Sequence, residues 1–168
     1  LDKTGTLTEG RMELVDVITL STTTADTALR LAAAVEAHSE HPIAAAIVAG
    51  AESRRPGDVS GTGVKDFENL PGRGVTAKVM SDSGIEWTVG VGRTSLFETI
   101  DQQLTDAQVL AETAGRTAVL AGWAEHSDGP LLAQAVLVVA DRLKPTSAEA
   151  VADLHALGLE VVLLSGDN

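Results

Sequence analysis

The sequence predicts a mixed fold, in which an antiparallel α+β unit is inserted between two chain ends of α/β type. Residues from about 63 to 140 follow a period of two, which is typical of half-buried strands in an antiparallel sheet. Residues 161–164 form a short apolar run rich in β-branched side chains and end in a polar turn, as a buried parallel strand does. The simplest topology makes residues 19–136 one domain, inserted into a second, discontinuous domain of residues 1–18 and 137–168.

The inserted domain is expected to begin with two helices. A polar linker at residues 21–24 offers hydroxyl groups that can cap a helix over residues 25–38. Pro42 suits the first turn of a second helix, because its missing N–H is not needed there. This helix is expected to run to about Ser53, before the turn at residues 54–57 closes it.

Alternating residues then predict a hairpin. Val75, Ala77 and Val79 alternate with polar or small residues, residues 81–84 make a turn, and residues 85–89 return as the partner strand. Two more helices are expected, at residues 105–114 and 145–157, ended by Gly115 and Gly158 respectively. Between them, two strands are expected at residues 118–124 and 132–139, joined by a turn at residues 126–129.

Composition limits the possible partners. The chain has 168 residues, 12 basic and 24 acidic side chains, a formal charge of −12 and a sequence pI of about 4.6. Such a surface argues against nucleic acids and anionic membranes as partners, since both require basic patches. The absence of cysteine excludes disulfides and thiolate metal sites. The longest apolar stretch is far shorter than the roughly 20 residues that cross a bilayer, so the chain is expected to be soluble.

The first residues of the chain carry reactive chemistry. Asp2 is a carboxylate that can attack the γ-phosphate of a nucleotide in line. Thr4 and Thr6 offer hydroxyl groups beside it, and Gly5 lets the backbone approach a phosphate closely. The pattern predicts a phosphoryl-accepting aspartate.

These residues resemble a known motif. Residues 2–8, Asp-Lys-Thr-Gly-Thr-Leu-Thr, resemble the phosphorylation motif of P-type ATPases, the ion pumps that pass through an aspartyl-phosphate. The resemblance implies that Asp2, Lys3 and Thr4 belong to the catalytic site. It also implies that Mg²⁺ is held partly by the Asp2 carboxylate and the Thr4 carbonyl. A polar turn after a strand, matching by chance, is the ordinary alternative.

A second resemblance lies at the other end of the chain. The residues Ser165-Gly166-Asp167-Asn168 are similar to the TGDN segment of the same pumps and of the wider haloacid-dehalogenase-like fold, with serine in place of threonine. The resemblance implies that Ser165 and the N–H of Gly166 hold phosphate oxygens, with Asp167 acting from behind them. It also makes the discontinuous domain a partial haloacid-dehalogenase-like phosphorylation domain.

The segment between the first two helices resembles the heavy-metal-transporting branch of these pumps. Its signature, Ser39-Glu40-His41-Pro42, implies that His41 and the upstream Glu36 recognise adenine. A neutral imidazole can stack on the base, and a carboxylate can accept a hydrogen bond from its exocyclic amine. In isolation, His41 would more often be a helix-capping or surface histidine.

Two glycine segments complete the expected nucleotide site. Gly72, Gly74 and Val75 resemble the family's GxG and the small aliphatic residue after it, which implies contacts with the base and the α-phosphate. Gly92 and Arg93 resemble its last contact segment, where the family commonly has Gly-Asn, so the role of the Arg93 side chain stays open. A strand-entry turn is the structural alternative for the GxG segment.

The resemblance implies that the chain is the ATP-binding and phosphorylation region of a heavy-metal exporter. It further implies ATP and Mg²⁺ as ligands, the transmembrane and actuator domains of a longer chain as partners, and a place at the cytoplasmic face of the membrane. Copper is the best single expectation for the transported ion, which would bind outside these residues. The segment at residues 141–145 resembles the family's returning hinge, with a surface loop as its alternative.

Two rival functions stay open. A phosphatase of the same fold usually carries a second aspartate two residues after the nucleophile, where this chain has Thr4, and threonine cannot transfer that proton. A non-catalytic ATP-binding module is the other rival. We expect the chain by itself to bind adenine nucleotides weakly and to turn over little or no ATP.

Overall fold

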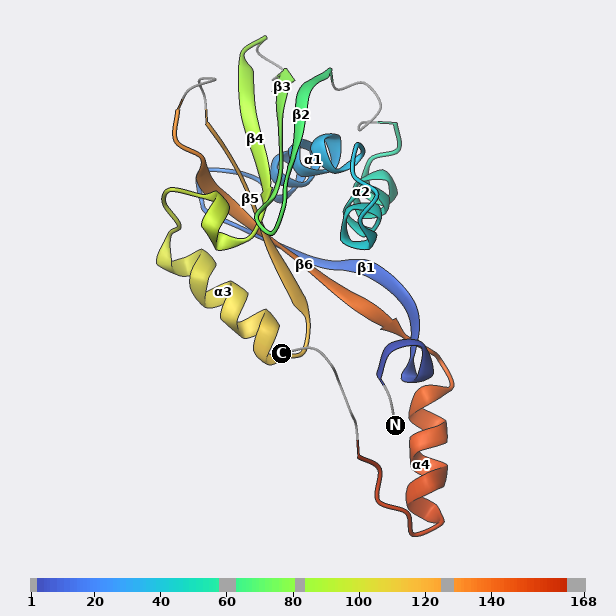
Figure 1. Cartoon of the computed structure of the whole chain (residues 1–168). Helices are drawn as coiled ribbons and strands as arrows, with labels where there is room; N and C mark the ends of the chain where they lie inside the picture. The colour runs from blue at the N-terminus through green and yellow to red at the C-terminus, as the bar shows by residue number, and fades with distance from the viewer. Residues whose placement is uncertain (1–2, 58–62, 81–83, 125–128, 163–168) are drawn as a thin grey trace.

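The computed structural model describes residues 3–57, 63–80, 84–124 and 129–162. Its centre is one six-stranded antiparallel sheet with the strand order β1-β6-β5-β4-β3-β2 (Figure 1). The strands are β1 (Thr8–Thr19), β2 (Val64–Leu70), β3 (Gly74–Met80), β4 (Glu86–Gly92), β5 (Thr117–Ala124) and β6 (Leu132–Leu143). The helices are α1 (Ala25–Glu36), α2 (Pro42–Arg54), α3 (Gln102–Thr113) and α4 (Ser147–Ala156), with a π-helical turn at Lys3–Leu7 and a 3-10 turn at Thr94–Leu96.

Helices cover both faces of the sheet. Residues of α1 and α2 pack on one face, where Leu31 and Ile47 share a buried cluster with Val79. On the other face Leu104 of α3 packs with Val136 and neighbouring strand residues. Because successive residues of a strand point to opposite faces, β5 and β6 each supply residues to both clusters. This explains the period of two in the sequence between residues 63 and 140.

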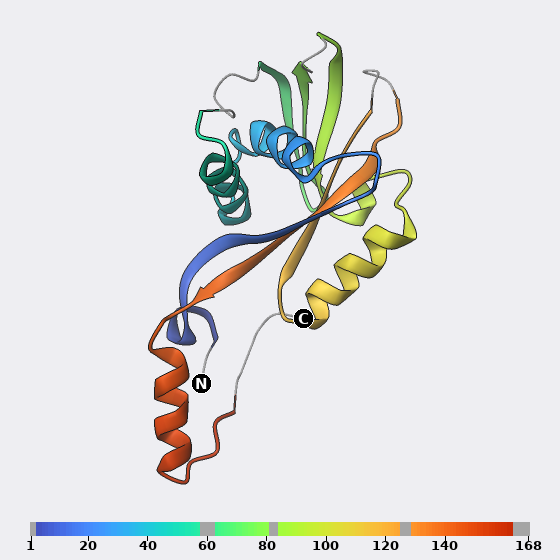
Figure 2. The same ribbon diagram turned by 180° about the vertical axis from the view of Figure 1, so that it is seen from behind.

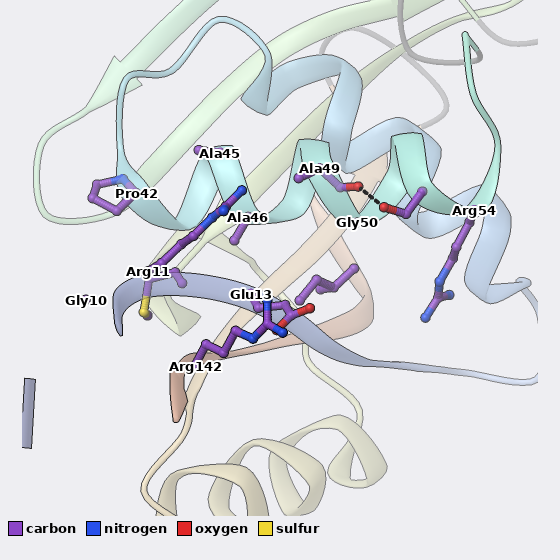
Figure 3. A pocket seen from close by; sticks show the side chains of 13 residues that line it. Gly10, Arg11, Glu13, Pro42, Ala45, Ala46, Ala49, Gly50, Arg54 and Arg142 are labelled. Carbon is purple, nitrogen blue, oxygen red and sulfur yellow. Dashed lines mark hydrogen bonds between the residues drawn. The ribbon is translucent and has the colours of Figure 1, made fainter. Parts of the chain in front are cut away.

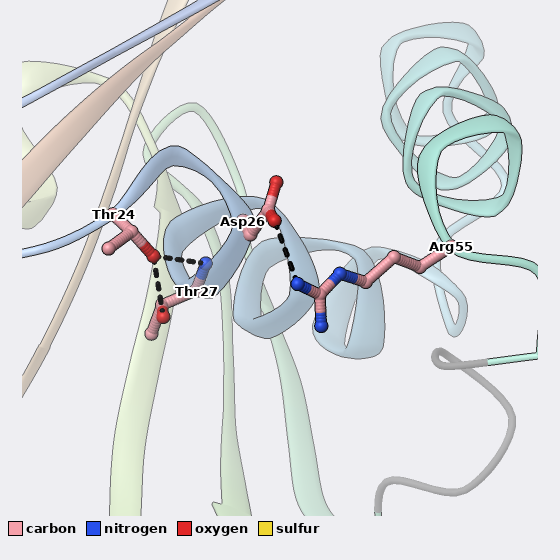
Figure 4. Close-up of polar contacts among 4 residues, drawn as sticks. All are labelled: Thr24, Asp26, Thr27 and Arg55. Atoms are coloured by element: carbon pink, nitrogen blue, oxygen red, sulfur yellow. Dashed lines mark hydrogen bonds and ion pairs between the residues drawn. The ribbon is translucent and has the colours of Figure 1, made fainter.

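Polar contacts join the two helices of the first face. The Thr24 side chain caps α1 by accepting a hydrogen bond from the Thr27 N–H at 3.1 Å (Figure 4). Asp26 in the first turn of α1 forms an ion pair with Arg55, just after α2, at 3.0 Å (Figure 4). The start of α1 therefore lies beside the end of α2.

The strands β1 and β6 form a long ribbon that leaves the sheet. Figures 1 and 2 show it running to the opening π-helical turn and to α4, well away from the other helices. The expected boundaries between residues 18 and 19 and between 136 and 137 both fall inside this ribbon, where Ile18 pairs with Val136. The division into two domains stays a prediction, and the connection between them is this continuous two-stranded ribbon.

Most of the expected elements are present. The two first helices, the hairpin of β3 and β4, and the strands β5 and β6 occupy the expected positions within a few residues. Helix α3 begins at Gln102 rather than near Thr105, because the Asp101 carboxylate caps it by accepting a hydrogen bond from the Gln103 N–H at 2.8 Å. Gly115 has φ 69° just after this helix, as expected of a residue in that position.

The structure contains two strands that the sequence did not predict, and it lacks the described part of one strand that was expected. The sequence did not predict β1 and β2, because both strands contain bulges that break the period of two: β1 between Thr8 and Met12 and again between Leu14 and Asp16, and β2 next to Asp66 with φ 51°. The strand expected at residues 161–164 is absent at 161 and 162, and the rest of it lies outside the described residues. A strand requires a neighbour for its backbone hydrogen bonds, and no described strand lies beside this segment.

Candidate functional site

The connection between α1 and α2 carries the two residues expected to recognise adenine. Helix α1 ends at Glu36, and His41 caps α2 four residues after Ala37. The His38 ring within this connection lies 5.8 Å from the ring of Phe67 in β2, centroid to centroid. The connection therefore lies against the β2 edge of the sheet, on the face that α1 and α2 cover.

Glu36 is a buried carboxyl with a perturbed pKa. Only 7% of the residue is exposed, since it lies at the end of an α1 face made mainly of alanine and leucine. Burial raises the pKa of the Glu36 carboxyl from its ordinary 4.5 to about 7, and a hydrogen bond with the Ser39 side chain offsets part of that rise. A buried carboxyl that titrates near neutral pH is more typical of functional sites than of surfaces.

His41 is exposed and holds a structural position. Its Nδ1 accepts a hydrogen bond from the Ile43 N–H at 3.2 Å, which caps the N-terminus of α2. An accepting Nδ1 leaves the proton on Nε2 in the neutral ring. The alternative role as a helix-capping histidine is thus present, and the His41 side chain is exposed.

The expected GxG segment forms the turn between β2 and β3. The Arg73 N–H donates to the Leu70 carbonyl at 2.9 Å, and Gly72 has φ 75°, which together make a type II turn with Pro71 in its second position. Nothing lies within 4 Å of the place where a Cβ on Gly72 would stand. The Gly72 backbone is therefore accessible to a ligand.

Gly74 and Gly92 face each other across the β3–β4 ladder. A Cβ on Gly74 would lie 2.2 Å from the Val91 carbonyl oxygen, and one on Gly92 would lie 2.1 Å from the Arg73 carbonyl oxygen. Both glycines are thus required by the close approach of the two strands, whether or not a nucleotide binds. Val75, which follows Gly74, is 6% exposed and packs in the cluster under α1.

Arg93 lies at the surface just after β4. Its backbone N–H donates to the Arg73 carbonyl at 2.7 Å, and its side chain makes no cap for the 3-10 turn that follows. The neighbouring Arg73 guanidinium donates to the Ser95 carbonyl at 2.8 Å. Glu36, His41 and the segments around Gly72 and Gly92 thus belong to the β2–β4 side of the sheet and to the helices packed on it.

The opening segment is attached to the expected hinge by contacts that the sequence did not predict. Thr8 is 1% exposed, and its hydroxyl donates to Asp141 Oδ2 at 2.5 Å and accepts a hydrogen bond from the Gly5 N–H at 3.1 Å. Asp141 Oδ1 accepts a second hydrogen bond, from the Arg11 N–H at 3.0 Å. The hinge is therefore not a free surface loop at Asp141.

Two further side chains, Lys144 in the hinge and Ser147 at the start of α4, hold the carbonyls of the opening turn. The Lys144 ammonium donates to the Gly5 carbonyl and the Ser147 hydroxyl to the Leu7 carbonyl, both at 2.6 Å. The Lys144 N–H also donates to the Leu7 carbonyl at 3.0 Å. We call Thr8, Asp141, Lys144 and Ser147 the hinge clasp. A lone Ser or Thr gives no signal in a single sequence, because only the pairing of β1 with β6 brings these residues together.

The residues expected to react with phosphate are described only in part. Asp2, Ser165, Gly166 and Asp167 lie outside the described residues. Lys3 and Thr4 begin the π-helical turn Lys3–Leu7, and of these two residues the backbone alone is described. Within the described ranges no group of three or more His, Asp or Glu side chains could hold a metal ion, and no helix is long and apolar enough to cross a membrane.

The fold and the opening motif agree with a comparison to known families. The sequence model of the haloacid dehalogenase-like hydrolase family matches residues 1–168, and the chain belongs to this family. The expected antiparallel α+β fold, with helices on the sheet, is confirmed by the structure and by its structural neighbours.

The chain is also similar in sequence to proteins named as copper-transporting ATPases. The probable copper-exporting P-type ATPase V of Mycobacterium tuberculosis is 43% identical over 171 residues, which cover 99% of this chain and 20% of that protein. Copper-transporting ATPase 1 of Rhizobium meliloti is 42% identical over 168 residues, covering all of this chain and 19% of that protein. The chain thus spans about a fifth of the length of these relatives.

Solved structures of similar fold come from the same group of proteins. A zinc-transporting PIB-type ATPase in its E2.Pi state has a TM-score of 0.76 and 28% identity, covering 99% of this chain and 25% of that one. The catalytic domain of the CPx-ATPase CopB-B has a TM-score of 0.63 and 28% identity, covering 99% of this chain and 51% of that one. The chain is homologous to part of the metal-transporting P-type ATPases.

Proposed function

We propose that this chain is the ATP-binding and phosphorylation region of a P-type ATPase that exports a heavy-metal ion, with copper as the ion. The observation that carries the proposal is the 43% identity to a probable copper-exporting ATPase across 99% of the chain. The match to copper-transporting ATPase 1 covers all of the chain and so includes residues 2–8, which carry the phosphoryl-accepting pattern. In this proposal the chain lies at the cytoplasmic face of the membrane and works with the transmembrane and actuator domains of a longer protein.

Adenine recognition is assigned to Glu36 and His41. An ionised Glu36 accepts a hydrogen bond from the exocyclic amine of adenine, and the exposed His41 ring stacks on the base. With a pKa of about 7, Glu36 is partly ionised near neutral pH. A hydrogen-bond donor on the bound ligand would offset the free-energy cost of the buried charge and so favour the ionised form. Gly72 supports this assignment, because its bare backbone leaves open space at the turn.

Phosphoryl transfer is assigned to Asp2 and to the residues expected around it. The Asp2 carboxylate forms a bond to the γ-phosphorus while the bond from that phosphorus to the bridging oxygen of ADP breaks. Carboxylate and carbonyl oxygens are donors that Mg²⁺ prefers, so Asp2 and the Thr4 carbonyl fit this ion, which neutralises phosphate charge when bound. Ser165 and Gly166 would donate hydrogen bonds to the phosphate oxygens, and Lys3 and Asp167 complete the proposed site.

The hinge clasp supports the proposal by its position. Gly5 and Leu7 follow Asp2 by a few residues, and their carbonyls are held by Lys144 and Ser147. A fixed backbone after the nucleophile would reduce the reorganisation that in-line attack requires. The threonine at position 4 would leave the acyl-phosphate without the acid and base of a phosphatase, which disfavours that rival.

The test is phosphorylation of the full-length parent with ATP labelled at the γ-phosphate. We expect an acid-stable, hydroxylamine-labile phosphoprotein, because an acyl-phosphate has that chemistry, and no labelling of the Asp2→Asn variant. Release of phosphate without a trapped phosphoprotein would favour the phosphatase. ATP binding with neither labelling nor release would favour the non-catalytic binding module.

A further inference from the structure

A cavity of about 510 Å³ lies between helix α2 and strand β1 (Figure 3). This volume is within the range of pockets that hold small organic ligands. None of the residues assigned to adenine recognition lines it, although Pro42, the neighbour of His41, stands at one end. The function proposed above leaves this cavity without a role.

Small residues of α2 create the hollow. Ala45, Ala46 and Ala49 face it and leave its volume unfilled (Figure 3). At Gly50 the helix comes so close to the strand that a Cβ would stand 2.5 Å from Leu14 Cδ2. The helix is thus held against β1 at Gly50 and leaves space beside its other small residues.

Three arginines from distant parts of the sequence line the same cavity. Arg11 comes from β1, Arg54 from the last turn of α2 and Arg142 from β6, with Glu13 as the one acidic residue of the lining. Figure 3 shows the Arg11 side chain extending from the strand across to the helix. The chain has only 12 basic residues and a net charge of −12, so three guanidinium groups in one cavity form a local concentration of positive charge.

Two of these guanidinium groups have no carboxylate partner among the described residues. Arg142 lies 3.9 Å from a Glu9 carboxylate oxygen. Across residues 3–57, 63–80, 84–124 and 129–162, Arg11 and Arg54 have no carboxylate within 4.0 Å. Like charges that share one cavity repel one another, and an anion placed among them removes that repulsion.

We propose that the cavity between α2 and β1 binds a small organic phosphate. Guanidinium groups match the geometry of phosphate oxygens and bind them through paired hydrogen bonds. Met12, Leu14 and the alanines of α2 form an apolar wall that would contact the organic part of the ligand. The site is separate from the adenine site and does not depend on it.

The test is titration of the chain with inorganic pyrophosphate, followed by backbone amide NMR. We expect saturable shifts in residues 10–14 and 45–50. The Arg11→Ala/Arg54→Ala double variant should raise the Kd about tenfold or more, since two charge-assisted contacts are lost. Arg116→Ala, which changes an exposed arginine after α3 on the other side of the sheet, should leave the Kd unchanged. Both altered side chains of the double variant are exposed, so its unfolding midpoint in urea should match the wild type.

Two further arms separate this site from the nucleotide site and identify the ligand class. His41→Asn should keep full pyrophosphate affinity, and a loss of affinity there would assign the anion to the nucleotide site instead. Measured by the shifts of residues 10–14 and 45–50 in the His41→Asn variant, AMP and ribose 5-phosphate should each bind more tightly than inorganic phosphate, and the tighter of the two identifies a nucleotide or a sugar phosphate. Absence of saturable shifts, an unchanged Kd in the double variant, or no gain from an organic group would overturn the proposal.

Discussion

The ionisation of Glu36 makes the stability of the fold depend on pH. Its pKa is about 7 in the folded chain against an ordinary 4.5, so the folded state retains a proton that the unfolded state loses between these values. The contribution of Glu36 to stability should therefore fall as the pH rises from 4.5 to 7 and stay low above that. By the usual conversion of pKa shifts, the whole change is on the order of 3 kcal/mol.

The Glu36→Gln variant isolates this effect. Glutamine cannot ionise, so its free energy of unfolding relative to the wild type should rise by up to about 3 kcal/mol between pH 4.5 and pH 8, measured by urea denaturation. Glu40→Gln is the matched control, since Glu40 is exposed in the same connection. Equal pH profiles for the wild type and Glu36→Gln would show that the carboxyl titrates normally.

His41 performs a structural task that must be separated from its proposed task with ATP. Alanine at this position removes both the ring and the cap on α2, and loss of a cap costs about 1 kcal/mol. Asparagine keeps a capping oxygen and removes the ring alone. We expect His41→Asn to keep the unfolding midpoint and His41→Ala to lower it, while calorimetry finds weaker ATP binding in both. Unchanged affinity in His41→Asn would leave the residue with its capping role only.

Gly92 should be intolerant of any side chain. Alanine there would place a Cβ 2.1 Å from the Arg73 carbonyl oxygen, so the β3–β4 ladder must separate. We expect Gly92→Ala to lower the free energy of unfolding by about 2 kcal/mol or more. Gly63→Ala serves as the control, because nothing lies within 4 Å of its Cβ position. A similar midpoint for both variants in urea would mean that the strands adjust without cost.

At the scale of elements, the hinge clasp connects the opening turn to the ribbon of β1 and β6. The change Thr8→Val keeps the side-chain shape but removes the donor to Asp141 and the acceptor for the Gly5 N–H. Both hydrogen bonds are partly buried and one involves a carboxylate, so their loss should cost about 1–3 kcal/mol, which urea denaturation should detect. Hydrogen exchange at the Gly5 amide should accelerate as well. Thr8→Ser restores the hydroxyl and should restore both measurements, and failure of that rescue would argue against the hydrogen bonds.

At the scale of the whole molecule, the chain spans about a fifth of its relatives. We expect the isolated chain to bind ATP weakly and to release little or no phosphate, because the proposed cycle also uses domains that lie elsewhere in a pump. Calorimetry with ATP and a phosphate-release assay measure the two properties. Sustained turnover by the purified chain would contradict this expectation.

The fold could be predicted where one physical signal dominates. Thr24 and Pro42 indicated the starts of α1 and α2, and the alternation of Val75, Ala77 and Val79 indicated the hairpin. Strand β1 was not predicted from the sequence. Its bulges change which residues face the core, so buried and exposed residues do not alternate along it. The run at residues 161–164 had the composition of a strand, but composition alone does not supply the neighbour that a strand requires.

The sequence by itself supplied the candidate chemistry: a motif at residues 2–8 that predicts a phosphoryl acceptor, a glutamate and a histidine predicted to recognise adenine, and glycines where strands turn. These are local features, written in residue type and spacing. Only the tertiary structure decided that Glu36 is buried with a raised pKa and that Arg11, Arg54 and Arg142 line one cavity. It also decided that β3 and β4 approach so closely at Gly74 and Gly92 that neither position has room for a Cβ. The physical reason is that burial, close approach and local charge depend on which segments pack together, as β3 does with β4 at the two glycines and α2 does with β1 and β6 around the cavity.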